Sequence, residues 1–409
     1  MKSLRQQGFY YGGLLYAFSV PFPQKIINIT LIVWILLSLL GCDKSTIIKS
    51  KHLWLLPAFY ATYFIGFFTS ETVSFKFLEY KLSLIIFPSL FVLHTYGYKQ
   101  RKRILKIFVW GLVASIITCL VVAFYNSFRI QNGNLLFQPN VLEGKGFMES
   151  ILYGGNYFFG RHLSIFHQTV YYALYLTTGV AVLLFMPKLF VQKLRLTLLI
   201  LLVGMIFLVS NKASFIALTF VSGFKLWRLN VRPGKKWVSV LLFTIVLLMF
   251  ALLNPRIKRS IITIAKGQMV LNKEARYGFG TRILSWNTAI SLIQERPLLG
   301  YGHADTQNVL NNKYKEKGYI YPLKENYNAH NLWLQSWLEN GFLAILLLGG
   351  VFLVLFYKSF DLSLFLAITF ILLINSMFEG LFNRFSGISF FSFLVCFIFS
   401  MPKGGWFKT

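Results

Sequence analysis

Residues 104–125 read ILKIFVWGLVASIITCLVVAFY, an apolar run in which Lys106 is the one charged residue. A helix needs about 20 apolar residues to cross the ~30 Å hydrocarbon core of a bilayer, and this run is long enough. The preceding residues 97–103 contain a cluster of cations: Lys99, Arg101, Lys102 and Arg103. Because short cytoplasmic loops are rich in lysine and arginine, the stretch predicts a transmembrane helix that starts at the cytoplasmic face.

Comparable apolar runs recur along the rest of the chain. The 409 residues are 56% hydrophobic and 13% charged, whereas a soluble protein has about 25% charged residues. Inside lipid every backbone N–H and C=O group must be paired within the protein, so each run is expected to be helical. The predicted helices lie near residues 8–22, 25–41, 52–70, 76–96, 104–125, 168–186, 194–210, 213–224, 236–253, 332–356, 360–378 and 386–402. We therefore predict an all-α polytopic membrane protein with about 12 transmembrane helices.

The positive charges indicate how these helices are oriented. If the N-terminus faces the cytoplasm, the only basic residues in the short outer loops are Lys212 and Arg384, whereas the short inner loops are rich in lysine and arginine. Both termini are then cytoplasmic, and we predict a location in a bacterial inner membrane. The net charge of +28 mostly reflects this bias and the attraction of cations to anionic membrane lipids. A nucleic-acid partner is therefore not expected.

Two outer segments are too long to be simple turns, and ordered loops of such length usually have a function. Residues 1–253 are expected to form helices one to nine, with a first periplasmic loop near 126–167. Residues 254–331 are expected to form a large periplasmic loop between helices nine and ten, which carries the site. Residues 332–409 are expected to form the last three helices.

The two long loops also collect histidines and cations. Four of the six histidines lie in or beside them: His162, His167, His303 and His330. The segment 254–331 also holds twelve lysine and arginine residues. Histidine is a suitable general base near neutral pH, and arginine and lysine attract anions, so the pattern indicates base chemistry on an anionic substrate. A solvated basic surface would account for many of the lysines equally well.

Acidic residues argue for a reaction without a metal ion. The chain has thirteen Asp and Glu residues, and no two of them lie within five positions of each other. The sequence therefore lacks the Asp-x-Asp pattern that commonly holds a divalent ion, and it lacks a closely spaced His or Cys cluster for zinc. If a diphosphate leaving group is handled, cationic side chains should neutralise it, and no cofactor is expected.

Several motifs between about residues 160 and 345 resemble the O-antigen ligase family, part of the O-antigen ligase/polymerase superfamily of membrane glycosyltransferases. The later motifs are Arg282-Ile-Leu-Ser-Trp286, Arg296-Pro-Leu-Leu-Gly300-Tyr-Gly302, Asn328-Ala-His330-Asn331 and Glu339-Asn-Gly341. The earlier ones are Arg161, Phe166-His167-Gln-Thr-Val-Tyr171 and Ser210-Asn-Lys212-Ala-Ser214. The order and spacing of the motifs carry the resemblance.

The resemblance implies a metal-independent transfer at the periplasmic face of the inner membrane. The donor would be a glycan on undecaprenyl diphosphate, and the acceptor a sugar of the lipid A core. His330 matches the family histidine that deprotonates the acceptor hydroxyl, and Arg282 matches an arginine that binds the diphosphate. Lys212 stands where the family usually has another arginine, so the charge is kept but the bidentate fork is lost. The other candidate substrate-binding residues are Arg161, His167, His303 and Asn331.

Three other functions share these features. An O-antigen polymerase or a protein O-oligosaccharyltransferase would use the same donor and chemistry with a different acceptor. A transporter for lipid-linked glycans would fit the number of helices, but such proteins usually contain internal repeats and charges near the membrane midplane. Here no convincing repeat is found, and the charges gather in one loop. Glu339 lies within an apolar helix, where an ionisable residue is usually paired or functional, so we expect it to pair with a basic residue.

Overall fold

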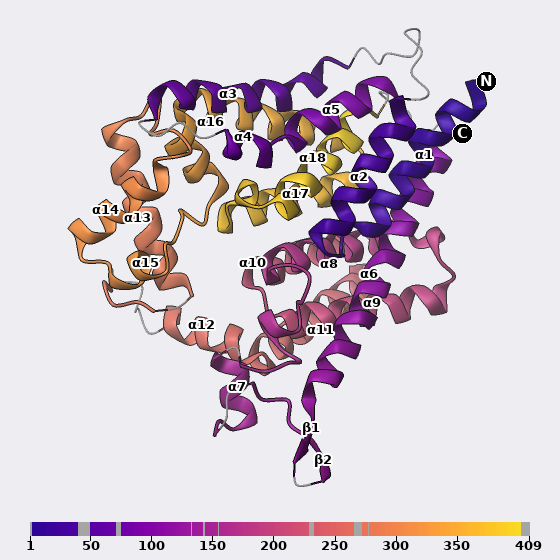
Figure 1. Cartoon of the computed structure of the whole chain (residues 1–409). Coiled ribbons are helices and arrows are strands. Elements are labelled where there is room, and N and C mark those ends of the chain that lie inside the picture. The colour runs from indigo at the N-terminus through magenta and orange to yellow at the C-terminus, as the bar shows by residue number, and fades with distance from the viewer. Residues whose placement is uncertain are drawn as a thin grey trace. The chain divides into compact units, whose positions relative to one another are not determined.

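A computed structural model of the chain describes residues 2–39, 50–70, 75–131, 133–141, 144–153, 155–228, 233–265, 272–276 and 278–401. Parts of the predicted loops therefore lie outside the described residues: 42–49, 71–74, 229–232, 266–271 and the C-terminal segment 402–409. Figure 1 shows a largely helical chain.

All twelve segments predicted to be helical contain helix. They correspond to α1 (Lys2–Ser19), α2 (Gln24–Leu39), α3 (Leu55–Thr69), α4 (Lys76–Tyr80) with α5 (Ser83–Leu93), α6 (Tyr98–Ser127), α8 (Thr169–Phe185), α9 (Gln192–Val209), α10 (Lys212–Trp227), α11 (Pro233–Leu253), α16 (Leu332–Ser359), α17 (Ser363–Phe378) and α18 (Phe385–Phe399). The predicted helix 76–96 differs in one respect, because it is interrupted at Lys81 and Leu82 between α4 and α5.

The predicted loops also contain regular structure. Residues 126–167 include strands β1 (Phe128–Gln131) and β2 (Asn134–Phe137), helix α7 (Phe147–Tyr153) and the 3₁₀ turn η3 (Gly160–His162). Residues 254–331 include helices α12 (Pro255–Ala265), α13 (Phe279–Glu295), α14 (Thr306–Lys317) and α15 (Ile320–Lys324). Further 3₁₀ turns are η2 (Lys51–Trp54), η4 (Pro187–Leu189) and η5 (Leu381–Asn383). The prediction of an all-α fold therefore misses one antiparallel two-stranded sheet.

Three of the described helices, α6, α9 and α16, are long and apolar enough to cross a membrane. Other apolar helices, including α2, α5, α8, α17 and α18, are shorter. The chain is thus a helical, multi-pass membrane protein, whereas the number of twelve spans and the side of each loop stay predictions.

The chain forms two compact units. The first comprises residues 1–41 and 97–262, and the second residues 42–96 and 263–409. In the first unit, α1 packs on α2 and α6, and α8 packs on α6, α9 and α10. Helix α8 is buried along nearly its whole length, from Val170 to Leu183. In the second unit, α16 packs on α3, α13, α17 and α18.

A small apolar core orders the segment that follows α12 in the second unit. It is formed by residues of α13, α14, the loops around them and α16: Leu284, Ala289, Leu292, Ile293, Tyr301, Leu310, Tyr314, Tyr319, Ala329 and Leu338. Tyr314 also donates a hydrogen bond through Oη to the Tyr327 carbonyl, at 3.0 Å. The loop that leads to His330 is therefore held against a packed scaffold.

Helix α16 has a kink at Gly341, and the turn 298–302 forms backbone hydrogen bonds with the helix at this kink. The Tyr301 and Gly302 amides donate to the carbonyls of Leu338 (2.7 Å) and Glu339 (3.0 Å), and the Phe342 amide donates to the Leu298 carbonyl (3.1 Å). The turn thus satisfies backbone groups that the kink frees from the helix. Gly341 has φ +73°, and a Cβ there would meet the Leu298 carbonyl. Two of the family-like motifs, 296–302 and 339–341, are therefore two sides of one backbone contact.

We expect Gly341→Ala to destabilise the protein by about 2–4 kcal/mol, because the left-handed conformation and the clash with Leu298 both disfavour a side chain. Thermal unfolding in detergent measures this as a lower Tm. The matched control is Gly349→Ala in the same helix, where the new Cβ would meet nothing within 4 Å besides the local helix backbone. Equal Tm values for the two variants would contradict the account of the kink.

Candidate functional site

Glu379 brings the two principal sequence candidates together in the second unit. Its Oε1 lies 3.2 Å from Nδ1 of His330, and its Oε2 lies 3.9 Å from Nη2 of Arg282. Arg282 stands near the start of α13, His330 lies just before α16, and Glu379 directly follows α17. The three side chains come from distant parts of the sequence, and the carboxylate lies between the imidazole and the guanidinium.

His330 is fixed by the backbone around it. The residue has φ +45°, a conformation that costs a non-glycine residue about 1–3 kcal/mol and that clusters at functional sites. Its amide donates to Asn328 Oδ1 at 2.7 Å, and the preceding Ala329 amide donates to Gln335 Oε1 at 3.0 Å. The next residue, Asn331, caps α16, since its Oδ1 accepts from the Trp333 and Leu334 amides. The ring is therefore held in place while 24% of the side chain is exposed.

The contact with Glu379 suits His330 for proton transfer. A carboxylate at Nδ1 favours the tautomer with its proton on that nitrogen, which leaves Nε2 able to accept a proton. The same carboxylate stabilises the imidazolium that would form. The ring of Tyr327 packs edge-on against His330, with centroids 5.1 Å apart. His330 and Glu379 thus have the arrangement of a general base with a group that orients it.

Arg282 supplies positive charge beside this pair. Burial lowers the pKa of its guanidinium, and the nearby Glu379 carboxylate opposes that effect. Arginine stays protonated at neutral pH even so. The guanidinium lies 5.9 Å from the centroid of the Phe378 ring, and Trp286 packs on the same ring at 6.2 Å. The buried Trp286 Nε1 has no hydrogen-bond acceptor among the described residues. An anion bound beside His330 and Glu379 would therefore meet one cation in a fixed position, the Arg282 guanidinium.

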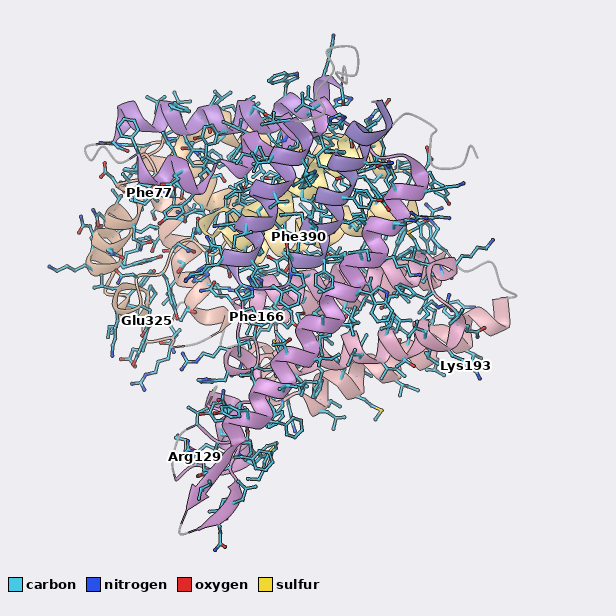
Figure 2. The ribbon with its side chains drawn as sticks, turned by 45° about the vertical axis from the view of Figure 1, so that its right-hand side comes forward. Phe77, Arg129, Phe166, Lys193, Glu325 and Phe390 are labelled. Carbon is cyan, nitrogen blue, oxygen red and sulfur yellow. The ribbon has the colours of Figure 1, made fainter. Side chains whose placement is uncertain are left out.

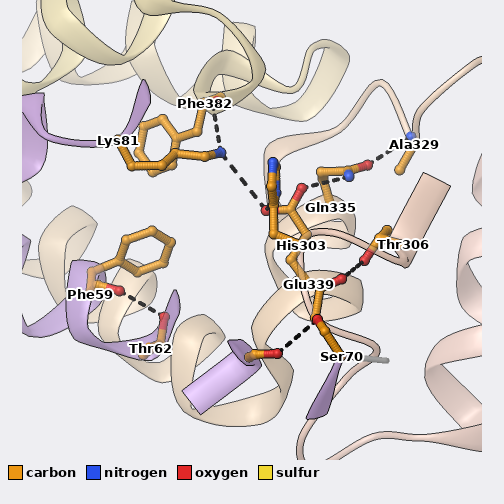
Figure 3. Close-up of polar contacts among 12 residues, drawn as sticks. Phe59, Thr62, Ser70, Lys81, His303, Thr306, Ala329, Gln335, Glu339 and Phe382 are labelled. Carbon is orange, nitrogen blue, oxygen red and sulfur yellow. Dashed lines mark hydrogen bonds and ion pairs between the residues drawn. The ribbon is translucent and has the colours of Figure 1, made fainter. Parts of the chain in front are cut away.

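His303 belongs to a second polar cluster, centred on the buried Glu339 (Figure 3). Glu339 Oε2 lies 2.9 Å from His303 Nδ1 and 3.9 Å from Lys81 Nζ, and its Oε1 accepts from Gln335 Nε2 at 2.7 Å. His303 Nδ1 therefore lies in direct polar contact with the Glu339 carboxylate. Lys81 also donates to the Phe382 carbonyl at 2.7 Å. The expectation that Glu339 pairs with a basic residue is confirmed.

Gln335 connects the two clusters. Its Nε2 donates to Glu339, and its Oε1 accepts from the Ala329 amide next to His330. The buried ion pair therefore supports the backbone that presents His330. Within this arrangement His303 and Asn331 make contacts to the protein itself, so their direct contact with substrate stays a prediction.

Lys212 lies in the first unit, as the first residue of α10. Two positions before it, Ser210 has a left-handed backbone with φ +56°. Asn211 caps the helix, because its Oδ1 accepts from the Ser214 amide at 3.0 Å. The buried Asn254 fixes this turn, because its Oδ1 accepts from Ser210 Oγ at 2.9 Å and its Nδ2 donates to the Phe207 carbonyl at 3.0 Å. A cation at the N-terminal end of a helix adds to the positive potential there.

Arg161 lies in η3 of the same unit and has a second guanidinium near it. Burial lowers the pKa of Arg256, and the positive charge of Arg161 lowers it further. Arg256 Nε donates to the Ile151 carbonyl at 3.0 Å, and its guanidinium lies 5.7 Å from the centroid of the Phe159 ring. Arg161 itself donates from Nε to Nε2 of His162 at 3.4 Å. The first unit thus gathers positive charge at η3 and the start of α12.

His167 lies in the interior of the first unit. Burial lowers its pKa to about 4, although backbone groups of Phe22 and Val20 act in the opposite direction. Its ring packs edge-on against Tyr175, with centroids 5.3 Å apart. A histidine with such a pKa is neutral at pH 7. The structure gives this candidate a packing role, and its contact with substrate stays a prediction.

Glu379 is the site residue that the sequence interpretation missed. It lies at the end of an apolar run, where a lone carboxylate next to the membrane could have indicated a functional residue. No short spacing links it to His330 or Arg282, so the motif pattern contains no sign of it. Among the described residues, no group of three or more His, Cys, Asp and Glu side chains is placed to hold a metal ion.

A comparison with protein families supports the resemblance. The family model described as O-antigen ligase matches residues 196–349. The matched region contains Lys212, Arg282, His303, His330 and Asn331, and it ends before Glu379. No curated protein sequence matches the chain. The resemblance predicted from the motifs is confirmed over residues 196–349, and the chain is a multi-pass membrane protein that contains a region similar to the O-antigen ligase family.

Proposed function

We propose that the protein transfers a glycan from undecaprenyl diphosphate to a sugar of the lipid A core at the periplasmic face of a bacterial inner membrane. The observation that carries the proposal is the group His330, Glu379 and Arg282. It combines a base, the carboxylate that orients it and a cation. The family match supports a membrane glycosyltransferase of the O-antigen ligase/polymerase type.

In the proposed reaction, His330 Nε2 takes the proton of the acceptor hydroxyl while its oxygen attacks the anomeric carbon of the donor sugar. A new glycosidic bond forms, and the bond from that carbon to the diphosphate oxygen breaks. The electron pair stays on undecaprenyl diphosphate, and the proton on His330 later passes to water. Glu379 stabilises the imidazolium throughout, because opposite charges lie next to each other in a partly buried site.

The departing diphosphate gains negative charge, and the proposed role of Arg282 is to stabilise it, which its position beside Glu379 and His330 supports. Fixed cations in a water-poor site stabilise a leaving group without reorganisation, so no metal ion is required by the proposal. Lys212 and Arg161 are proposed as substrate-binding residues on the family resemblance alone. We also propose that 254–331 is a periplasmic loop, that both termini are cytoplasmic and that the chain spans the membrane twelve times.

Deletion of the gene in the native strain tests the identity of the acceptor. If the protein is the ligase, the core lipid A should remain bare while long glycan accumulates on undecaprenyl diphosphate. Lipopolysaccharide gels and lipid extracts measure both. A core that carries a single repeat unit would instead indicate a polymerase. Unchanged lipopolysaccharide with glycoproteins that lose their glycans would indicate a protein acceptor.

A further inference from the structure

The β1–β2 hairpin has one apolar face. Phe128 pairs with Phe137, and Ile130 pairs with Leu135. Residues directly opposite each other in an antiparallel pair, and residues two apart on one strand, point to the same side. These four side chains therefore share a face, and all of them are exposed, Ile130 to 80% and Leu135 to 67%. Monomeric soluble surfaces rarely leave such a continuous apolar face uncovered.

The other face of the hairpin is more polar. It carries Arg129, paired with Leu136, and the exposed Asn134. Figure 2 labels Arg129 on the hairpin at the end of the long helix α6. Leu136 is the apolar exception on this face. It provides a control, because the side chains of the adjacent Leu135 and Leu136 point to opposite faces of the hairpin.

The apolar face continues a stripe on α6. Ile117, Val121 and Phe124 are exposed on that helix, and their spacing, extended to Phe128, is that of one helical face. The rings of Phe124 and Phe137 lie 6.4 Å apart, and those of Phe128 and Phe137 lie 5.4 Å apart. Because α6 is long and apolar enough to cross a membrane, lipid is the natural cover for its exposed stripe. The same cover then extends over the hairpin.

The length of α6 sets the level of the hairpin in the membrane. The apolar run 104–125 is about 33 Å long at ~1.5 Å per residue, close to the thickness of the hydrocarbon core. The hairpin starts three residues later, at Phe128. It therefore begins near the lipid head groups at the C-terminal end of α6, where the aromatic residues Phe124 and Tyr125 also lie.

The strand edges limit how deep the hairpin can go. A two-stranded sheet leaves the outer N–H and C=O groups of both strands without sheet partners. Such groups need water or head groups, so the hairpin backbone does not enter the hydrocarbon. We propose that the hairpin lies on the bilayer surface at the C-terminal end of α6, with Phe128, Ile130, Leu135 and Phe137 inserted between the lipid head groups. The inference does not depend on the proposed function.

Nitroxide labels on the two adjacent leucines test this placement. Leu135→Cys and Leu136→Cys are made in a chain without Cys42, Cys119 and Cys396, and each is labelled in liposomes of phosphatidylethanolamine and phosphatidylglycerol. The ratio of collisions with oxygen to collisions with a water-soluble nickel chelate should be several-fold higher at 135 than at 136. Equal ratios at the two positions would overturn the proposal. Dipolar broadening between copies labelled at 135 would also overturn it, by showing a second copy as the cover.

A measurement on the unaltered chain avoids the risk that the variants misfold. A phospholipid with a diazirine near the glycerol end of one acyl chain is added to the same liposomes and activated by light. Lipid adducts located by mass spectrometry are expected on 128–137 as well as on the α6 stripe. Adducts on α6 without any on 128–137 would exclude contact between the hairpin and the bilayer surface.

Discussion

Replacement of His330 by alanine should lower the rate of glycan transfer by about 10²–10⁴-fold, the usual contribution of a general base. The acceptor hydroxyl would then lose its proton only to water, and Glu379 would have no imidazolium to stabilise. Because the side chain is partly exposed and the Asn331 cap of α16 remains, the variant should insert and accumulate normally. Transfer by purified protein at matched donor concentration measures the effect.

His52→Ala is the matched control for this variant. His52 lies in η2 against the ring of Phe399 and has no part in the proposed reaction. Its replacement should leave transfer within a few-fold of the wild-type rate. Activity near the wild-type level in purified His330→Ala would exclude His330 as the base, whatever the behaviour of the control.

Replacement of Arg282 should be the second most damaging change. Removal of one fixed group that stabilises developing charge typically costs about 10²–10³-fold in rate, and we expect a loss of this size for Arg282→Ala. Arg282→Lys should recover only part of it, because lysine lacks the planar fork of donors. Lys315→Gln, at an exposed position of α14, is the control and should retain activity. Equal activity of Arg282→Lys and the wild type would contradict a bidentate role.

A double-mutant cycle separates the two partners of Glu379. If Glu379 acts by orienting His330, then Glu379→Gln should have little further effect once His330 is alanine, since coupled residues are not additive. When Glu379→Gln is combined with Arg282→Ala, it should lower the transfer rate by the same factor as in the wild-type chain, because it acts through His330. Full additivity in both cycles would mean that the contacts of 3.2 and 3.9 Å have no role in the reaction.

The helices could be predicted from the sequence because long apolar runs leave the backbone no other way to satisfy its hydrogen bonds in lipid. The break between α4 and α5 could not, because it lies at Lys81, whose partners Glu339 and Phe382 lie far along the chain. The hairpin was also missed. Its two strands have only four residues each, and the second has three apolar residues in a row, so the alternation that marks a strand is not clear.

The candidate site was predictable only where its residues stand in local sequence motifs. His330 and Arg282 stand in motifs with fixed local spacing, and the glycines at 300, 302 and 341 belong to a backbone contact that the motifs share. Glu379 has no such motif, because its role arises only when α17 brings the carboxylate beside His330. The roles of His303 and Asn331 also depend on tertiary contacts, with Glu339 and with the start of α16.

Reconstituted transfer tests the central claim most directly. Purified protein in liposomes would receive a glycan on undecaprenyl diphosphate and lipid A core as acceptor, in the presence of an excess of a strong chelator. The account predicts formation of glycan-bearing lipid A core at the rate seen without chelator, with release of undecaprenyl diphosphate. Loss of transfer on chelation that magnesium or manganese restores, or no transfer to lipid A core by active protein, would contradict it.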